Sequence, residues 1–142
     1  PLWRRRTPQL MVVDTSALVA VLLAEPEAEA FLQAFQGSSV TLISTATLVE
    51  AKIVVARALG EPGLQHLDLL LQKAEIDPVP LHLEHVHWAL RGWRQFGKGR
   101  HRAALNLGDC FSYALAMATA EPLLFKGDDF GLTDVAIALQ AP

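Results

Sequence analysis

The sequence has little cysteine and no long apolar run, and both absences narrow the class of protein. Cys110 is the single cysteine among 142 residues, so the chain cannot close an internal disulfide or build a cysteine cluster around a metal. A reducing cytoplasm is therefore the expected compartment. The longest apolar stretches, such as 17–24, are far shorter than the roughly 20 residues that span a bilayer, so no membrane segment is expected.

A basic excess is also absent. Twelve Lys and Arg residues against fifteen Asp and Glu residues give a formal net charge of -3. Taken as a sum, this balance argues against a nucleic-acid partner, because proteins that bind phosphates usually carry an excess of positive charge. The charges are unevenly distributed along the chain, because no acidic residue occurs between Val86 and Gly108.

That acid-free segment holds five of the twelve basic side chains, which are Arg91, Arg94, Lys98, Arg100 and Arg102. It is either a solvated helix end or a rim that binds phosphates. In the second interpretation Arg91, Lys98, Arg100 and Arg102 position a nucleic-acid backbone. The aromatic residues in between would stack on unpaired bases if exposed, although tryptophans at helical spacing more often belong to a core.

What is present is the composition of one packed domain. Hydrophobic residues make up 51% and charged residues 19% of the chain, which excludes a disordered or low-complexity protein. We expect residues 1–10 to be an extension ahead of the domain, foreign or derived from upstream coding sequence, with Met11 as a candidate natural start. Residues 11–142 then form a single domain.

Short apolar runs alternate with helical patterns along the chain. Strands are predicted over 10–13, 40–43, 79–81 and 122–125, with 135–139 as a candidate last strand. Helices are predicted after Asp14, from Pro26, and over 45–59, 63–74, 82–96 and 109–120. This alternation predicts an α/β domain with a mainly parallel sheet covered on both faces, whose ligands bind beyond the carboxyl ends of the strands.

Carboxylates follow the predicted strands. Asp14 comes directly after the first strand, Asp109 opens a helix, and Asp128 and Asp129 follow the strand 122–125. Taken alone, Asp14 and Asp109 are better explained as helix caps, and Asp128 and Asp129 as ordinary turn residues. Glu50 differs, because its helical neighbours at i±3 and i±4 are mostly apolar and include no base, and a carboxylate is costly to bury without a partner.

Together these acids predict a cation site. Several carboxylates at strand ends would repel one another unless a cation neutralised them. The hard ions Mg²⁺ and Mn²⁺ suit oxygen ligands and support phosphodiester hydrolysis. Neither a glycine-rich nucleotide-binding loop nor an HExxH zinc motif occurs, so other cofactors are not indicated.

Four segments, in order along the chain, resemble the motifs of PIN-domain ribonucleases, in particular the VapC-type toxins of bacterial toxin–antitoxin pairs. They are 11–18 (MVVDTSAL), 44–50 (STATLVE), 107–116 (LGDCFSYALA) and 123–130 (LLFKGDDF). Each motif is short and weakly specific, whereas four in this order and spacing are strong. The resemblance covers nearly the whole chain, from residue 11 to about 139.

The resemblance implies a three-layer α/β/α PIN-like domain in which Asp14, Glu50 and Asp109 bind Mg²⁺, with Mn²⁺ as a possible substitute. Asp128 matches the fourth acid of the family, and Asp129 is the alternative. The family pattern of a threonine followed closely by Asp or Asn is replaced here by residues 125–127, which displaces the acid by about one position.

The resemblance also implies a function and partners. The chain would be a metal-dependent endoribonuclease and the toxin of a type II toxin–antitoxin system, with an RNA substrate, a VapB-type antitoxin and a homodimeric assembly. Apolar residues of the early helices, Leu22, Leu23 and Phe35, fit either an interface or the core. Two alternatives stay open: a non-catalytic PIN-like module that binds RNA or protein, and a doubly wound phosphatase or phosphoacceptor domain. The second would need an acid beside Asp14 that the sequence does not supply.

Overall fold

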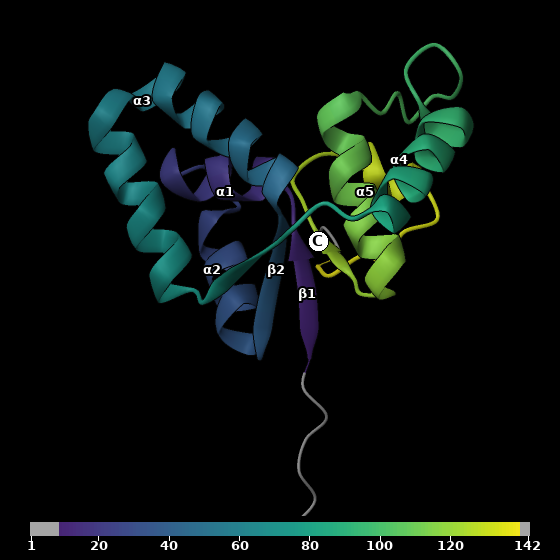
Figure 1. Cartoon of the computed structure of the whole chain (residues 1–142). Coiled ribbons are helices and arrows are strands. Elements are labelled where there is room, and N and C mark those ends of the chain that lie inside the picture. The colour runs from purple at the N-terminus through teal and green to yellow at the C-terminus, as the bar shows by residue number, and fades with distance from the viewer. Residues whose placement is uncertain (1–8, 140–142) are drawn as a thin grey trace, which may run out of the picture.

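A computed structural model describes residues 9–139 (Figure 1). Most of the expected extension, residues 1–8, lies outside the described residues, and the first strand begins at Leu10. The elements in chain order are β1 (Leu10–Val13), α1 (Thr15–Leu22), α2 (Ala28–Gly37), β2 (Val40–Ser44), α3 (Thr45–Lys73), β3 (Ile76–Val79), α4 (Leu83–Phe96), α5 (Leu107–Thr119), β4 (Leu123–Leu124) and the 3-10 helix η1 (Phe130–Leu132).

The four strands form one sheet in the order β3-β2-β1-β4, and every pairing is parallel. Helices α1, α2 and α3 lie on one side of the sheet, and α4 and α5 lie on the other (Figure 1). This arrangement confirms the predicted three-layer α/β/α class with a parallel sheet. Because all strands run the same way, the residues that follow them meet at one edge of the sheet.

Successive side chains of β1 point to opposite faces of the sheet, so this strand contributes to the core on both sides. Met11 and Val13 point to the layer of α1, α2 and α3, where they pack with Phe31. Val12 points to the opposite layer and packs with Tyr113 of α5. Successive strand side chains face opposite sides of a sheet, so an apolar run of this length is buried on both faces.

Helix α3 bends back on itself at Gly60, whose φ of 65° is a left-handed conformation that glycine adopts without strain. The structure thus contains the two helical arms predicted over 45–59 and 63–74, joined at a kink. An ion pair of 3.1 Å between Lys52 and Asp68 links the arms. The kink lets the first arm approach the strand ends while the second leads to β3.

Three predicted boundaries are corrected. The candidate strand 135–139 makes only an isolated pairing of Ile137 with Leu123, because β4 is just two residues long and offers little backbone to pair with. The edge strand β3 begins earlier than predicted, at Ile76. Helix α5 begins at Leu107, because Asn106 caps it. Within residues 9–139, no helix combines the length and apolar character that crossing a membrane requires.

Candidate active site

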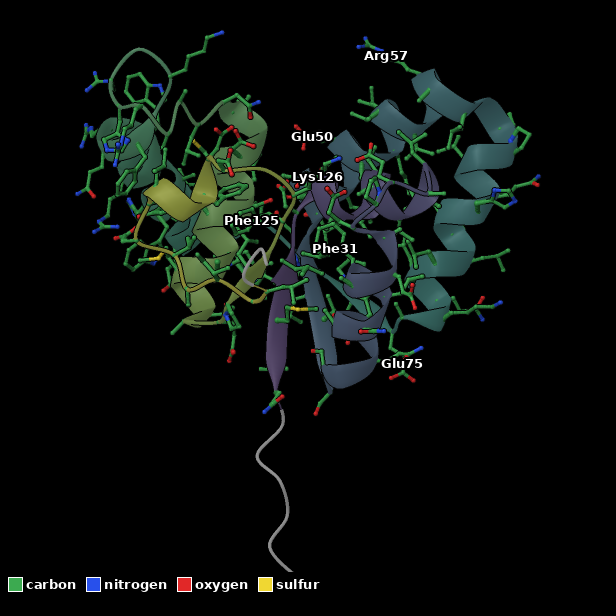
Figure 2. The ribbon with its side chains drawn as sticks, turned by 180° about the vertical axis from the view of Figure 1, so that it is seen from behind. Phe31, Glu50, Arg57, Glu75, Phe125 and Lys126 are labelled. Carbon is green, nitrogen blue, oxygen red and sulfur yellow. The ribbon has the colours of Figure 1, made fainter. Side chains whose placement is uncertain are left out.

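Three of the predicted acids line one cavity. Asp14 follows β1, Glu50 lies in the second turn of α3, and Asp109 lies in the first turn of α5. Their shared cavity has a volume of about 380 Å³. Figure 2 shows Glu50 and Lys126 at this end of the molecule, between the two helical layers. The parallel topology therefore brings together carboxylates that lie far apart in the sequence.

Asp14 caps α1 and lines the acidic cavity. Its Oδ2 accepts a hydrogen bond of 3.0 Å from the backbone N–H of Ser16, which caps α1. Its Oδ1 accepts a bond of 2.5 Å from the hydroxyl of Ser112, and the Ser112 hydroxyl lies 3.3 Å from that of Thr47. With only 3% of its surface exposed, Asp14 is fixed in orientation by these donors. Sequence analysis missed Ser112, although it lies one helical turn after Asp109.

Glu50 has no basic partner among the described residues. Its Oε1 accepts a hydrogen bond of 2.6 Å from the Thr15 hydroxyl, and the nearby Lys52 is paired with Asp68 instead. Its Oε2 lies so close to Gly108 that a β-carbon at that position would overlap it. The glycine of the third motif therefore gives the carboxylate of Glu50 access to the start of α5.

Asp109 is held by the cap of α5. The side chain of Asn106 accepts a bond of 2.8 Å from the Asp109 N–H, and Asp109 Oδ2 accepts one of 3.0 Å from the Asn106 N–H. Burial, the largest cause, and the negative charges of Asp14, Glu50 and Asp129 together raise the pKa of Asp109 to about 6, against the opposing effect of the Asn106 N–H. The cavity thus concentrates negative charge.

The donor set fits a hard divalent cation. Within residues 9–139, no three Asp, Glu, His or Cys side chains stand in a ready-made ligand arrangement. Carboxylate oxygens are nevertheless the ligands that Mg²⁺ prefers. Three carboxylates share one cavity, and the charges of Asp14 and Glu50 add to the effect of burial in raising the pKa of Asp109, so a cation would relieve like-charge repulsion.

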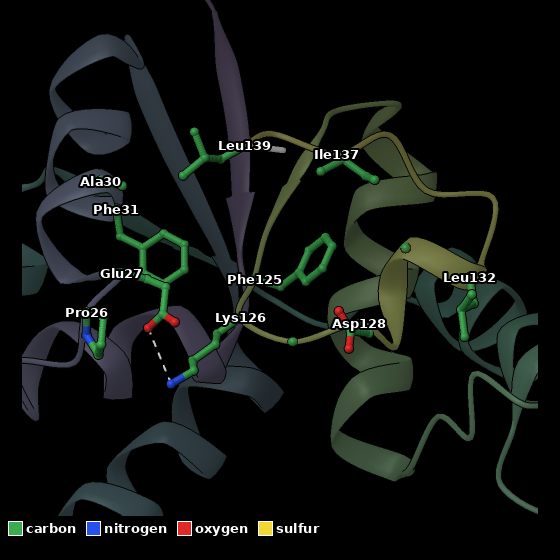
Figure 3. Close-up of a pocket in the computed structure, with 12 residues that line it drawn as sticks. Pro26, Glu27, Ala30, Phe31, Phe125, Lys126, Asp128, Leu132, Ile137 and Leu139 are labelled. Carbon is green, nitrogen blue, oxygen red and sulfur yellow. Dashed lines mark ion pairs between the residues drawn. The ribbon is translucent and has the colours of Figure 1, made fainter. Parts of the chain in front are cut away.

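The two candidates for the fourth acid differ in position. Asp128 does not line the acidic cavity; it lines a neighbouring apolar groove of about 950 Å³ between α2 and the C-terminal segment (Figure 3). Asp129 contributes to the raised pKa of Asp109, which places its charge nearer to the cavity. The electrostatic effect on Asp109 therefore favours Asp129, whereas the resemblance to the family motif favours Asp128.

Lys126 lines both the acidic cavity and the apolar groove. Its ammonium pairs with Glu25 and, at 3.3 Å, with Glu27, and its backbone N–H donates to the Ser16 hydroxyl at 2.9 Å. Figure 3 shows the pair with Glu27 across the groove. Sequence analysis did not single out Lys126, because its partners lie about 100 residues away and no local pattern connects them.

The structure separates the predicted RNA-binding residues into two groups. Arg91 is engaged with the Tyr113 hydroxyl and with Asp134, the latter at 3.1 Å. The other three, Lys98, Arg100 and Arg102, are exposed on the loop 97–106. Two backbone hydrogen bonds of 2.9 Å close the base of this loop, from the Lys98 N–H to the Leu105 carbonyl and from the Leu105 N–H to the Phe96 carbonyl.

This fold and this acidic cavity define a class of protein. The PIN domain model matches residues 11–136, so the chain belongs to the PIN-domain family. It is 51% identical over 126 residues to ribonuclease VapC30 of Mycobacterium tuberculosis, covering 89% of this chain and 96% of that protein. A ribonuclease VapC of Mycolicibacterium smegmatis is also 51% identical, with 89% and 98% covered. Within the PIN domains the chain therefore falls with the VapC ribonucleases, as the motifs predicted.

Solved structures share the fold. VapC20 of Mycobacterium tuberculosis, described as a toxin that cleaves the sarcin-ricin loop, has a TM-score of 0.71 at 14% identity, with 89% of this chain and 96% of that chain covered. VapBC2 of Rickettsia felis, bound to a DNA fragment from its promoter, has a TM-score of 0.72 at 14% identity, with 91% and 96% covered. At this identity the likeness concerns the fold alone.

Proposed function

We propose that the chain is a metal-dependent endoribonuclease that acts in the cytoplasm as the toxin of a type II toxin–antitoxin system. The observation that carries the proposal is the gathering of Asp14, Glu50 and Asp109 in one cavity at the carboxyl ends of the parallel strands. Relatives at 51% identity are named ribonuclease VapC, which supports the same activity.

The three acids would hold Mg²⁺, or Mn²⁺ in its place. A bound divalent ion lowers the pKa of a coordinated water and offsets the charge that develops on a phosphodiester during hydrolysis. The chain's own residues orient the ligands: Ser112 and Ser16 fix Asp14, Thr15 fixes Glu50, and Asn106 fixes Asp109. A fourth carboxylate, Asp129 or Asp128, would complete the acidic set.

RNA would be bound by the loop 97–106, which carries Lys98, Arg100 and Arg102 and leads directly into α5 and Asp109. A closed loop base fixes the backbone that carries these cations, so less backbone entropy is lost when phosphates bind. Arg91 contributes by supporting α4 and α5 through Asp134 and Tyr113, at a position where its guanidinium is already paired.

An antitoxin partner and a homodimer belong to the same proposal. Solved neighbours of the fold include a toxin–antitoxin complex from Klebsiella pneumoniae, with a TM-score of 0.66 at 18% identity. The apolar groove adjoins the acidic cavity, and Lys126 lines both. A VapB-type segment in this groove would therefore reach the edge of the acidic cavity.

The decisive experiment is RNA cleavage by the wild-type chain and by Asp14→Asn. Asparagine caps a helix as well as aspartate does, so the variant is expected to fold normally and to lose cleavage. EDTA should stop cleavage by the wild type, and added Mg²⁺ should restore it. Sequencing the ends of RNA from cells that briefly express the protein, with Asp109→Ala as a control, would identify the substrate.

The alternatives give different results in the same experiments. A non-catalytic binding module would retain RNA or protein binding without any EDTA-sensitive cleavage. A phosphoacceptor domain would form an acyl phosphate on Asp14 after incubation with a small phosphodonor. Cleavage by Asp14→Asn with unchanged metal dependence would contradict the assignment of Asp14.

A further inference from the structure

The face of α3 that carries Glu50 continues beyond the acidic cavity. In a helix with 3.6 residues per turn, the residues three, four and seven positions after Glu50 share its face. These residues are Ile53, Val54 and Arg57, which we call the α3 ledge. Val54 lines the acidic cavity together with Glu50, so this face of the first arm does point towards the site.

Arg57 is an exposed cation at the far end of the α3 ledge. Within residues 9–139 it forms no salt bridge, whereas Lys52, the other base of the first arm, is paired with Asp68 at 3.1 Å. No acidic residue occurs over 51–59. The positive charge of Arg57 is therefore available to a ligand. Seven residues of helix place its backbone about 10 Å beyond that of Glu50.

The acidic cavity lies between Arg57 and the basic loop 97–106. Figure 2 shows Arg57 at the outer end of the first arm of α3 and the loop at the same end of the other lobe, with Glu50 between them. Positive charge therefore stands on both sides of the carboxylates. A polyanion that crosses the cavity is repelled by its carboxylates and attracted at both edges.

An exposed apolar side chain lies between each cationic edge and the cavity. On the α3 side it is Ile53, which is 50% exposed. On the other side it is Leu107, which is 74% exposed and joins the loop 97–106 to Gly108, where the carboxylate of Glu50 makes its contact. Single exposed apolar residues are normal on a surface, but these two flank the acids. Apolar side chains in such positions can contact the faces of unpaired bases.

We propose that Arg57 binds a phosphate of the RNA on the side of the acidic cavity opposite to the loop 97–106, and that Ile53 contacts a base between that phosphate and the cavity. This inference rests on the proposed function. A strand held at both edges keeps the phosphodiester between them in place over the acids, which favours reaction by lowering the entropy lost on the way. Arg57 is thus a positioning residue.

A purely structural role of Arg57 makes a different prediction. Arg57 lies near the carboxyl end of the first arm, where a cation interacts favourably with the helix dipole. Lys73 has the same relation to the second arm, because it lies in the last turn of α3. It is close in sequence to Glu75, which Figure 2 shows at the opposite end of the molecule. Lys73→Gln is therefore a matched control away from the proposed RNA path.

Binding of a fluorescent oligouridylate in EDTA, measured across a salt series, tests the phosphate contact. Arg57→Gln should weaken binding and reduce the slope of log affinity against log salt by about 0.7, the value for one phosphate of a single strand. Arg57→Lys should restore most of the slope, and Lys73→Gln should behave as the wild type. An unchanged slope in Arg57→Gln, or an equal loss in Lys73→Gln, would overturn the proposal.

The same assay tests the base contact. Ile53→Ser should weaken binding at every salt concentration without changing the slope, because no phosphate contact is lost. Val49→Ser is the control, since Val49 is 58% exposed on the same arm but directly precedes Glu50 and so lies off its face. Equal losses in the two variants, or no loss in Ile53→Ser, would remove Ile53 from the RNA path.

A phosphate scan tests whether the two edges hold opposite sides of the strand. RNA oligonucleotides that span the mapped cleavage site would carry a neutral methylphosphonate at one position at a time. Where the neutralised phosphate is the partner of Arg57, Arg57→Gln should have no further effect on affinity. That phosphate should lie on one side of the cleavage site, and the partners of Arg100 and Arg102 on the other. Partners on the same side would contradict the proposed path.

The outcomes separate this inference from the proposed function. Cleavage by the wild type, with a wild-type salt slope in Arg57→Gln, would contradict the inference alone. A shallower slope in Arg57→Gln, without any EDTA-sensitive cleavage by the wild type, would contradict the proposed function alone. A wild type that neither binds nor cleaves RNA would contradict both.

Discussion

The carboxylate of Glu50 occupies the space that a β-carbon would need at position 108, so it keeps this position only because residue 108 is glycine. The same contact brings Glu50 into the cavity of Asp109. The second and third motifs, almost 60 residues apart, are therefore in contact at a point where the third motif has no side chain.

The first prediction follows from this contact. Gly108→Ala should displace Glu50 and reduce RNA cleavage by about 10- to 100-fold, the range found when the support of a metal ligand is removed. Stability should not fall in parallel, since alanine favours a helix over glycine. Gly37→Ala is the control, because that position has open space around it. Equal activity of the two variants would show that the position of Glu50 is unimportant.

A second prediction concerns the buried bond between Ser112 and Asp14. Ser112→Ala leaves one oxygen of a nearly fully buried carboxylate without its donor, which should cost about 1–3 kcal/mol of the free energy of unfolding. Urea denaturation of Ser112→Ala, Asp14→Ala and the double variant measures the coupling. The double variant should be more stable than the sum of the single losses predicts, and strict additivity would argue against the bond.

A third prediction separates the two candidates for the fourth acid. Asp129→Asn should reduce cleavage more than Asp128→Asn, because the charge of Asp129 acts on Asp109 whereas Asp128 faces the apolar groove. Single-turnover rates at saturating Mg²⁺ compare the two variants directly. A larger loss in Asp128→Asn would restore the assignment made from the sequence motif.

A fourth prediction separates the basic residues by role. Arg100→Gln/Arg102→Gln should weaken RNA binding and flatten its salt dependence, because fewer counterions are released when fewer phosphates are neutralised. Arg91→Gln should leave the salt slope unchanged and lower thermal stability modestly, since its pair with Asp134 is partly exposed. The test is RNA affinity measured across a salt series, and an Arg91→Gln slope as shallow as that of the loop variant would place Arg91 on the RNA.

A fifth prediction concerns pH and α4. Burial lowers the pKa of His85 below its ordinary 6.5, as does the neighbouring His82, with Glu84 opposing, and His85 Nδ1 accepts a bond of 3.3 Å from the His82 N–H. The unfolded chain therefore takes up a proton near pH 6.5 that the folded chain binds only at lower pH. The free energy of unfolding that neutral His85 contributes is therefore fully present above about pH 6.5 and is lost as the pH falls below that value.

The measurement is the free energy of unfolding by urea at about pH 7.5 and pH 5.5, on either side of the ordinary histidine pKa. His85→Gln keeps an acceptor but does not titrate, so its stability should fall less between the two conditions than that of the wild type. An identical fall in both proteins would remove His85 as the cause.

Local chemistry made most of the fold predictable. The run at Met11–Val13 is buried on both faces, as an apolar strand of a parallel sheet should be, and Gly60 separates two helical arms as expected. The candidate strand over 135–139 is reduced to an isolated pairing, because its pairing depends on the length of β4, which the local sequence does not determine. The start of α5 was read from Asp109, whereas Asn106 and Asp109 cap it together.

Which acids line the cavity was more predictable than the contacts that orient them. Asp14, Glu50 and Asp109 were selected by position after strands or on an apolar face, and the parallel topology does bring them together. The hydroxyls that orient them were not selected, because serine and threonine carry no spacing signal of their own. Lys126 was missed for a similar reason, because its ion pairs are with Glu25 and Glu27, which are distant in the sequence.

The bond between Ser112 and Asp14 joins residues 98 positions apart, and this sets an order of events during synthesis. Asp14 emerges from the ribosome early, but its partners on α5 follow only after four helices and three strands have been made. A nascent chain that ends before α5 therefore lacks both Asp109 and the Ser112 donor of Asp14. If these residues form the active site, unfinished copies of that length are inactive because of the order of the elements.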